Sequence, residues 1–179
     1  AGAGGNSEGG SPVGAVSEDG TREVVFWHSM DGVYAEITQK QVDQFNETIG
    51  KEKKIHVTPV FQNWPGTEAL TAAMSTDDVE NMPDVIQLYG EHVSLVRDYD
   101  RLVWAEDMLS KEGNSVAKED LISNAVSSFE INDRLAGVPW SVCALLLYYN
   151  QDYLDQIGAQ VPATIDELSL IHISEPTRR

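Results

Sequence analysis

The sequence contains few cysteines and few basic residues, and both shortages limit what the protein can do. Cys143 is the one cysteine among 179 residues, so an intramolecular disulfide is excluded. This count leaves the redox compartment open, because many exported proteins lack disulfides. Only 12 Lys and Arg residues stand against 29 Asp and Glu residues, for a net charge of −17. A surface this acidic repels polyanions, which excludes nucleic acid as a partner and disfavours binding to an anionic membrane surface.

Long apolar runs are also missing. The longest, from Val142 to Tyr149, is far shorter than the roughly 18 residues that mark a membrane-spanning helix. No signal peptide is recognisable, although the start is typical of a chain from which a leader has been removed. Hydrophobic residues make up 41% of the chain. That share is enough for a core of about 120 residues between the two ends.

The familiar motifs of catalysis and metal binding are absent. The four histidines lack the spacing of a zinc site, and no serine lies in a GxSxG elbow. No P-loop or GxGxxG segment follows a predicted strand. Among the 29 acidic residues no pair is singled out for glycoside hydrolysis, and nothing marks Cys143 as a nucleophile. We therefore expect a protein that is not an enzyme and that needs no cofactor and no metal.

Both ends of the chain differ in composition from the middle. Residues 1–21 are rich in Gly and Ser, and we expect a disordered tether there. The tether is either a plain terminus or the spacer behind the lipid-modified cysteine of an exported lipoprotein. Residues 168–179, LSLIHISEPTRR, abandon amphipathic spacing, and we expect an adapter-derived tail that is not native. The alternative for this segment is a genuine short strand and tail.

A βαβ unit is predicted between residues 24 and 60. The apolar run Val24–Trp27 reads as a strand, and apolar residues then recur at helical spacing from Val33 to Ile49. Gly50 is expected to end this helix, and Ile55–Val60 reads as the second strand. Strand, helix and strand in this order imply parallel pairing and a right-handed crossover.

The rest of the ordered chain continues the α/β pattern. Further elements are expected at these places: helices over 67–74, 90–99, 120–128 and 151–157, a strand over 85–89, and a hairpin around Asn132-Asp133. Thr164 and Glu167 have the spacing of a capping box. The predicted fold class is α/β, with a mostly parallel sheet flanked by helices in residues 22–141.

The stretch Leu135–Asn150 is expected to leave this first lobe. It reads as two short strands joined by a polar crossing at Trp140–Cys143. The second strand, Ala144–Tyr149, shows no polar alternation, which predicts burial of both its faces. We interpret residues 142–167 as the interlobe crossing and the truncated start of a second lobe.

Ligands of open α/β sheets bind beyond the carboxyl ends of the strands. The residues expected there, with those at the crossing, are His28, Ser29, Asp31, Asn63, Trp64, Gly90, Glu91, Trp140, Ser141 and Cys143. Indole faces stack on the C–H faces of sugars, while amide, hydroxyl and carboxylate groups pair with sugar hydroxyls. These residue types favour a sugar ligand. For Trp64 and Trp140, loop packing stays open as the alternative to ligand contact.

Three segments in order carry a resemblance to a known family. They are Val25–Gly32 (VFWHSMDG), Met82–Gln87 (MPDVIQ), and Leu145–Asn150 (LLLYYN) with Val161–Thr164 (VPAT). Together they resemble the extracellular solute-binding proteins of family 1, the carbohydrate receptors of ABC importers. The opening segment is most similar to the glycerol-3-phosphate-binding branch. The resemblance covers about residues 22–167.

The resemblance implies two periplasmic-binding-protein-like lobes that close on a solute and deliver it to a membrane permease. It also implies an extracytoplasmic monomer, either periplasmic or a lipoprotein at the cell surface, without enzymatic activity. In the glycerophosphate receptors an aromatic residue, a glutamate and a serine hold the ligand. Here Trp64 lies near the first position, Gly90 occupies the second with Glu91 one residue later, and Cys143 replaces the serine. These departures favour a neutral mono- or oligosaccharide over a glycerol phosphate. The alternative is a glycan-degrading or adhesion protein of the cell surface that uses the same lobe.

Overall fold

The computed structural model describes residues 14–143 and 146–168. The chain divides into two units, Ala1–Ser141 and Val142–Arg179, which are described separately below. Their assignment as lobes of a two-lobed receptor stays a prediction.

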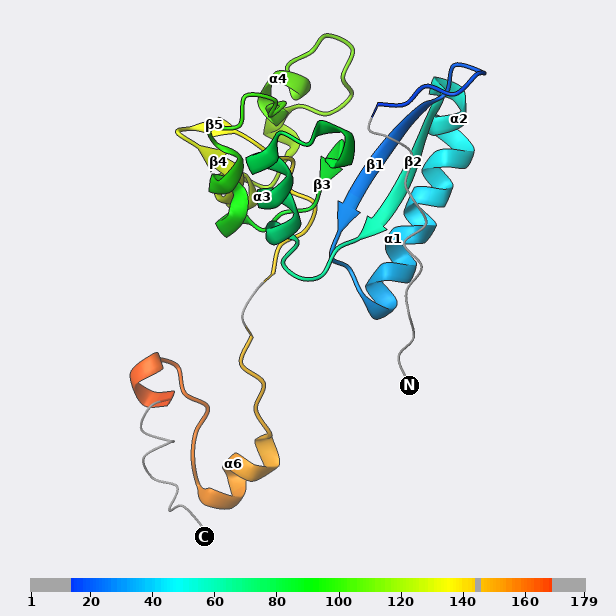
Figure 1. Cartoon of the computed structure of the whole chain (residues 1–179). Helices are drawn as coiled ribbons and strands as arrows, with labels where there is room; N and C mark the ends of the chain where they lie inside the picture. Colours follow the sequence, from blue (N-terminus) through cyan, green and yellow to red (C-terminus); the bar gives the residue numbers. More distant parts are fainter. Residues whose placement is uncertain (1–13, 144–145, 169–179) are drawn as a thin grey trace. The chain divides into compact units, whose positions relative to one another are not determined.

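A three-stranded parallel sheet organises the first unit (Figure 1). β1 (Arg22–His28) lies in the centre and pairs along its whole length with β2 (Ile55–Phe61). On its other side β1 pairs with β3 (Val85–Ile86). The order is β2-β1-β3, so the predicted βαβ unit with parallel pairing is confirmed.

The crossover between β1 and β2 is a helix that runs longer than predicted. α1 (Gly32–Phe45) continues through the π-helical turn Asn46–Gly50 into α2 (Lys51–Lys53). The prediction that Gly50 ends the helix is therefore wrong, and Lys54, with φ of 56°, takes the left-handed position. Gly50 is needed for a different reason, because a Cβ there would lie 2.6 Å from the Ile55 carbonyl oxygen.

The apolar stripe of α1 is only partly covered. Val42 is buried, whereas Val33 and Ile37 near the start of the helix are 69% and 45% exposed. Asn46 fastens the end of the crossover to β2: its amide donates to the Val57 carbonyl and accepts the Val57 N–H, at 2.9 and 2.8 Å. The helix is thus held to the sheet by polar groups at its end as much as by apolar packing along its length.

Short elements fill the remainder of the first unit. They are α3 (Thr67–Thr76), η2 (Val79–Asn81), η3 (Gly90–Val96), α4 (Ala105–Leu109), η4 (Lys118–Asp120), α5 (Ser123–Val126), η5 (Ser127–Phe129), β4 (Glu130–Ile131) and β5 (Arg134–Leu135), where η marks 3₁₀ helices. β4 and β5 form the hairpin predicted around Asn132-Asp133, and both turn residues have positive φ.

Three predicted elements are shorter or more broken than expected. The third strand ends at Ile86 instead of Tyr89, and the last backbone bond to β1 is donated by the Gln87 N–H to the Trp27 carbonyl. The helix expected over 90–99 is the 3₁₀ helix η3, whose first residue, Gly90, packs directly against the Ser128 carbonyl. The helix expected over 120–128 is divided into η4, α5 and η5.

Two small apolar clusters lie beneath these short elements. Val93, Ile131 and Ala136 form one, and Ala105, Val126 and Leu135 form the other. Phe129 packs against both clusters and joins them. Leu135 is completely buried, so the hairpin β4–β5 is anchored through it.

The residues before β1 are more ordered than the predicted tether allows. Val16 forms an antiparallel bridge with Arg22, and Gly20 N–H donates to the Ser17 carbonyl. The Lys54 ammonium donates to the Asp19 carbonyl at 2.7 Å. Residues 14–21 therefore form a hydrogen-bonded turn against the amino ends of β1 and β2, and residues 1–13 of the expected tether lie outside the described part.

The second unit contains α6 (Gln151–Ile157), as predicted. The Asn150 side chain accepts the N–H of Tyr153 at its start, and Gly158 (φ 65°) ends it. The expected capping box forms with one shift: Thr164 Oγ1 accepts the Glu167 N–H, while the Glu167 carboxylate accepts the N–H of Ala163. Residues 169–179, the expected adapter-derived tail, lie outside the described part.

The predicted buried strand Ala144–Tyr149 is not found in its described part. Residues 146–149 form no strand, and Leu146 and Tyr148 are 69% and 87% exposed. An apolar run is buried as a strand only where neighbouring strands pair with it, and no described segment does so. Residues 144–145 lie outside the described part. Within the described residues, no helix is long and apolar enough to span a membrane.

We predict that Leu135→Ala will strongly destabilise the first unit. Its side chain is fully buried beside Ala105 and Val126, so truncation leaves a cavity. The expected loss is about 2–5 kcal/mol in urea unfolding followed by circular dichroism. Ile122→Ala, at a side chain 68% exposed, is the matched control and should cost far less. Equal effects of the two variants would contradict the core described above.

We also predict that Glu106 makes the stability depend on acid pH. Its carboxylate accepts the Leu135 N–H at 3.1 Å and lies 3.2 Å from the Lys118 ammonium. The hydrogen bond from Leu135, aided by Lys118, lowers the pKa of Glu106. A lowered pKa adds stability above the ordinary value of about 4.3, and this stability is lost as pH falls through the folded-state pKa.

Urea unfolding between pH 7 and pH 3 measures this effect. Wild type should lose stability on acidification more steeply than Glu106→Gln, which has no charge to lose. The exposed Glu112→Gln variant should follow wild type. Parallel curves for wild type and Glu106→Gln would contradict the assignment.

Candidate functional site

The carboxyl ends of β1, β2 and β3 meet at one edge of the sheet, and hydrogen bonds tie together the loops that follow them. The Gln62 N–H donates to the His28 carbonyl at 2.8 Å, joining the loop after β2 to the end of β1. The Ser29 N–H donates to Gln87 Oε1 at 3.1 Å, joining the loop after β1 to the residue after β3. Three segments that are distant in sequence therefore converge at this edge.

An aromatic pair spans the loops after β2 and β3. Trp64 and Tyr89 lie edge to face, with ring centroids 4.2 Å apart and an interplanar angle of 83°. Trp64 is nevertheless 54% exposed, so the contact with Tyr89 holds the indole while leaving much of it open to solvent. An exposed, held indole is a surface on which a ligand can stack.

Gly66 brings the Ser29 hydroxyl next to the loop that carries Trp64. Gly66 is buried with φ of 76°, and a Cβ there would lie 3.3 Å from Ser29 Oγ. Its backbone conformation is one that glycine adopts without strain. The hydroxyl of Ser29 is thus close to the loop 62–66, as required if both contribute to one site.

His28 ends β1 as a buried residue, only 7% exposed. Its ring contacts the rings of Phe26 and Phe61, with centroids 5.6 and 6.1 Å away. The Met30 N–H donates to Nδ1 at 3.3 Å, which leaves the ring hydrogen of the neutral form on Nε2. Burial lowers the pKa of His28. His28 is therefore a buried, uncharged polar residue at the end of β1, where the loops begin.

The ring of Trp140 contacts the ring of Phe26 in β1. Their centroids are 6.2 Å apart in an edge-on arrangement, and Trp140 is 48% exposed. Phe26 also contacts His28, so one continuous set of rings runs from Trp140 to the end of β1. The end of the first unit thus supplies a second half-exposed indole.

Four of the other predicted site residues make no hydrogen bond or ion pair with Trp64 or Ser29 among the described residues: Asp31, Asn63, Gly90 and Glu91. Asp31 and Asn63 are exposed in the loops after β1 and β2, and neither side chain makes a hydrogen bond within the described part. Gly90 packs against Ser128, and the exposed Glu91 lies 3.7 Å from His92 Nε2.

Ser141 and Cys143 lie on either side of the division between the units. Both are exposed. Ser141 ends the first unit, and Cys143 belongs to the second. For Cys143, a role beside the first unit stays a prediction.

Gln87, Tyr89 and Gly66 were missed by the sequence prediction. Gln87 and Tyr89 were read as strand residues, although both follow an apolar strand as the other site residues do. No sequence pattern singles out Gly66 within its loop. The contacts of these residues arise from three loops that are far apart in sequence, and no local pattern reveals such contacts.

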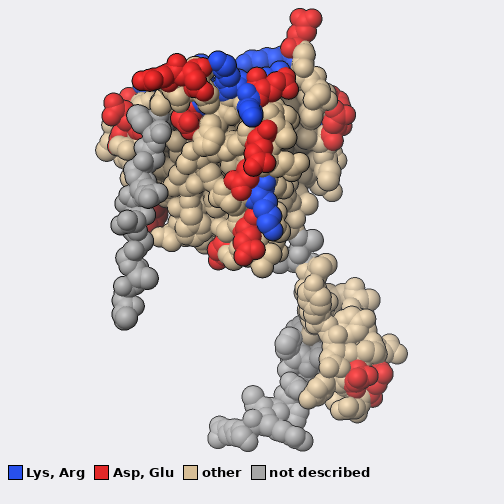
Figure 2. Space-filling view, turned by 90° about the vertical axis from the view of Figure 1, so that its right-hand side faces the viewer, with Lys and Arg blue, Asp and Glu red and all other residues tan. Residues whose placement is uncertain are grey.

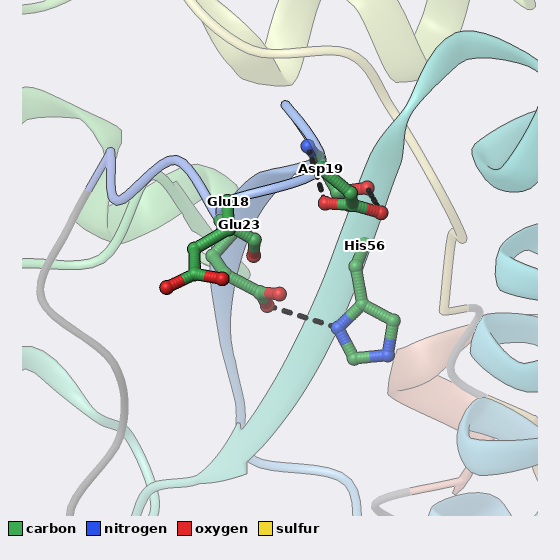
Figure 3. A pocket seen from close by; sticks show the side chains of 6 residues that line it. Glu18, Asp19, Glu23 and His56 are labelled. Atoms are coloured by element: carbon green, nitrogen blue, oxygen red, sulfur yellow. Dashed lines mark hydrogen bonds and ion pairs between the residues drawn. The ribbon is translucent and has the colours of Figure 1, made fainter.

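A surface hollow lies at the opposite, amino end of β1 and β2 (Figure 3). Ser17, Glu18, Asp19, Thr21, Glu23 and His56 line it. Glu23 and His56 pair at 2.9 Å, and Asp19 accepts the N–H and hydroxyl of Thr21, which lowers the pKa of Asp19. Asp19 and Glu23 are thus paired within the protein itself. Among the described residues no group of three or more potential ligands could hold a metal.

Comparisons with known proteins bear on the fold. No protein-family model and no curated protein sequence matches the chain. The sugar-binding protein MalE from the phytopathogen Xanthomonas citri is similar in structure, with a TM-score of 0.63 and 27% identity over 83% of this chain and 36% of that chain. The GacH receptor of Streptomyces glaucescens, solved unliganded and with acarbose, gives a TM-score of 0.55 at 17% identity, again over 83% and 36%.

A de novo designed cysteine esterase, ECH19, also matches, with a TM-score of 0.60 at 20% identity over 82% of this chain and 34% of that chain. The chain thus spans about a third of the length of each of these structures. The parallel sheet flanked by helices is the α/β fold of a periplasmic-binding-protein-like lobe, and it is shared with sugar-binding proteins.

We predict that the pKa of His28 lies below its ordinary value because the ring is buried. Since burial lowers its pKa, protonation opposes folding, and stability should fall as pH drops from about 6.5 toward the folded-state pKa. An NMR titration of the ring proton resonances should give a midpoint below about 6.5. A midpoint at or above that value would contradict the buried position.

Proposed function

We propose that this chain is the ligand-capturing part of an extracytoplasmic carbohydrate receptor. The observation that carries the proposal is the half-exposed Trp64, held edge-on by Tyr89 beside the polar groups of Ser29 and Gln87. The similarity to the sugar-binding protein MalE supports it. The ligand would be a mono- or oligosaccharide.

Physical chemistry favours a sugar for this combination of groups. A pyranose presents C–H faces that stack on an indole and a rim of hydroxyls that need hydrogen-bond partners. At this edge the indole of Trp64 supplies the stacking surface, and the Ser29 hydroxyl supplies a donor and acceptor. A purely apolar ligand would leave these polar groups without partners, at a cost in affinity.

The charges of the first unit favour a neutral sugar over a sugar phosphate. No Lys or Arg occurs in the segments nearest the site, which are 29–33, 62–66, 87–91 and 137–141. Lys51 and Lys53 belong to α2, which precedes β2 and so lies at the amino end of the sheet. Figure 2 shows basic side chains of this unit intermingled with acidic ones. Lys118 and Arg134 are already paired with carboxylates. A phosphate would therefore find no Lys or Arg in the four segments nearest the site.

The whole protein would act by capture and delivery. A ligand that touches two lobes favours the closed arrangement because it gains contacts there that the open one lacks. The closed receptor would then pass the sugar to the permease subunits of an ABC importer, as a monomer. A lipid anchor before residue 14 would hold it at the cell surface. No bond-making is required in this role.

We predict weak, neutral-sugar-selective binding by the 179-residue chain. Saturation-transfer NMR with maltose, trehalose and glucose 6-phosphate should detect at least one neutral disaccharide. The dissociation constant should be on the order of millimolar, because one lobe buries little of a ligand. Glucose 6-phosphate should bind more weakly, and the disaccharide should remain intact after incubation.

Trp64→Ala should abolish the disaccharide signal, because it removes the stacking surface. Ile49→Ala is the matched control, since Ile49 is 56% exposed, much as Trp64 is, but lies near the other end of the sheet. Equal binding by Trp64→Ala and wild type would overturn the site. Hydrolysis of the sugar would favour the glycoside hydrolase alternative instead.

A further inference from the structure

We propose that Gln87 is a specificity-determining residue, whose side-chain amide positions Ser29 through Oε1 and donates to a sugar oxygen through Nε2. This inference rests on the proposed function and deepens it. It concerns a residue that the sequence patterns placed inside a strand, and it is carried by the hydrogen bonds at the carboxyl edge of the sheet.

Gln87 is held at two points. Its backbone N–H donates to the Trp27 carbonyl at 2.9 Å, which continues the pairing of β3 with β1 by one residue. Its side-chain Oε1 accepts the Ser29 N–H at 3.1 Å in a partly buried position. Both main chain and side chain are therefore ordered before any ligand arrives, so little entropy is lost when the amide binds a ligand.

The bond to Ser29 also decides which way the amide faces. A backbone N–H can only donate, so the atom that meets it must be the oxygen, and the nitrogen Nε2 takes the other position. The two atoms of one amide are about 2.3 Å apart, so Nε2 lies within about 5.5 Å of the Ser29 nitrogen. This is the same edge at which Ser29 Oγ approaches Gly66.

Nε2 has two hydrogens to donate, and no described residue accepts them. The Gln87 side chain is partly exposed, and Nε2 is not among the described buried polar atoms that lack a partner. A donor held at the edge that also carries an exposed indole is suited to fix the orientation of a stacked sugar. Stacking on Trp64 alone would tolerate many orientations, whereas a donor at a fixed position favours one.

The amide is chemically suited to the role in a way that a carboxylate is not. Glutamate at this position would keep an acceptor for the Ser29 N–H but would lose both donors. Gln87→Glu therefore separates the two functions of the side chain: positioning of Ser29 is retained, and donation to the ligand is lost. Gln41→Glu makes the same chemical change on an exposed site of α1 and serves as the control.

The first experiment uses the wild-type chain and needs no variant. In a ¹H–¹⁵N NMR titration with maltose and trehalose, the side-chain NH₂ resonances of Gln87 should shift together with the Trp64 indole N–H. If the indole shifts and the Gln87 NH₂ does not, the inference is overturned while the proposed function stands. If neither shifts with any disaccharide, the proposed function fails and the inference fails with it.

The second experiment compares variants. Gln87→Glu should bind the disaccharide roughly tenfold more weakly than wild type, as expected for the loss of one or two hydrogen bonds. Its melting temperature and the Ser29 amide resonance should stay close to those of wild type, and Gln41→Glu should bind normally. Unchanged affinity of Gln87→Glu would assign Gln87 a structural role only and would overturn the inference.

Discussion

The fold depends on the central position of β1. Hydrogen bonds along both of its edges bring β2 and β3 alongside it in parallel, although the three strands are spread over residues 22 to 86. Parallel pairing places all three carboxyl ends at one edge of the sheet. Every contact of the candidate site follows from this arrangement, because the loops that carry Ser29, Trp64 and Gln87 start at that edge.

Hydrogen bonds between the loops hold the candidate site together at the edge of the sheet. The ladder of β3 is only two residues long, and its next residue turns its side chain back to the loop after β1. Three residues beyond the end of this strand, Tyr89 contacts Trp64. Binding residues commonly lie on irregular loops whose ends are held in place by a rigid scaffold.

Charge is distributed unevenly along the same axis. Basic side chains of α2 lie at the amino end of the sheet, and several other cations of the described part are used in ion pairs. Aromatic and uncharged polar groups, with the exposed acids Asp31 and Glu91, lie at the carboxyl end. The two ends of one small sheet therefore offer different chemistry, which is consistent with a neutral ligand at the carboxyl end.

The βαβ unit, the hairpin at Asn132-Asp133 and the helix Gln151–Ile157 can all be predicted from the sequence. Their signals are local: periodicity, turn residues and a terminal glycine act within a few residues. The sequence also placed His28 at the end of a strand, and Ser29 and Trp64 in the loops that follow strands.

The remaining features depend on the three-dimensional arrangement. The bond between Ser29 and Gln87, the pairing of Trp64 with Tyr89 and the fit of Gly66 to Ser29 join segments more than 30 residues apart, or different loops. Leu146 is exposed although it lies in an apolar run. Burial requires a neighbouring surface, and a local sequence pattern does not show whether one is present.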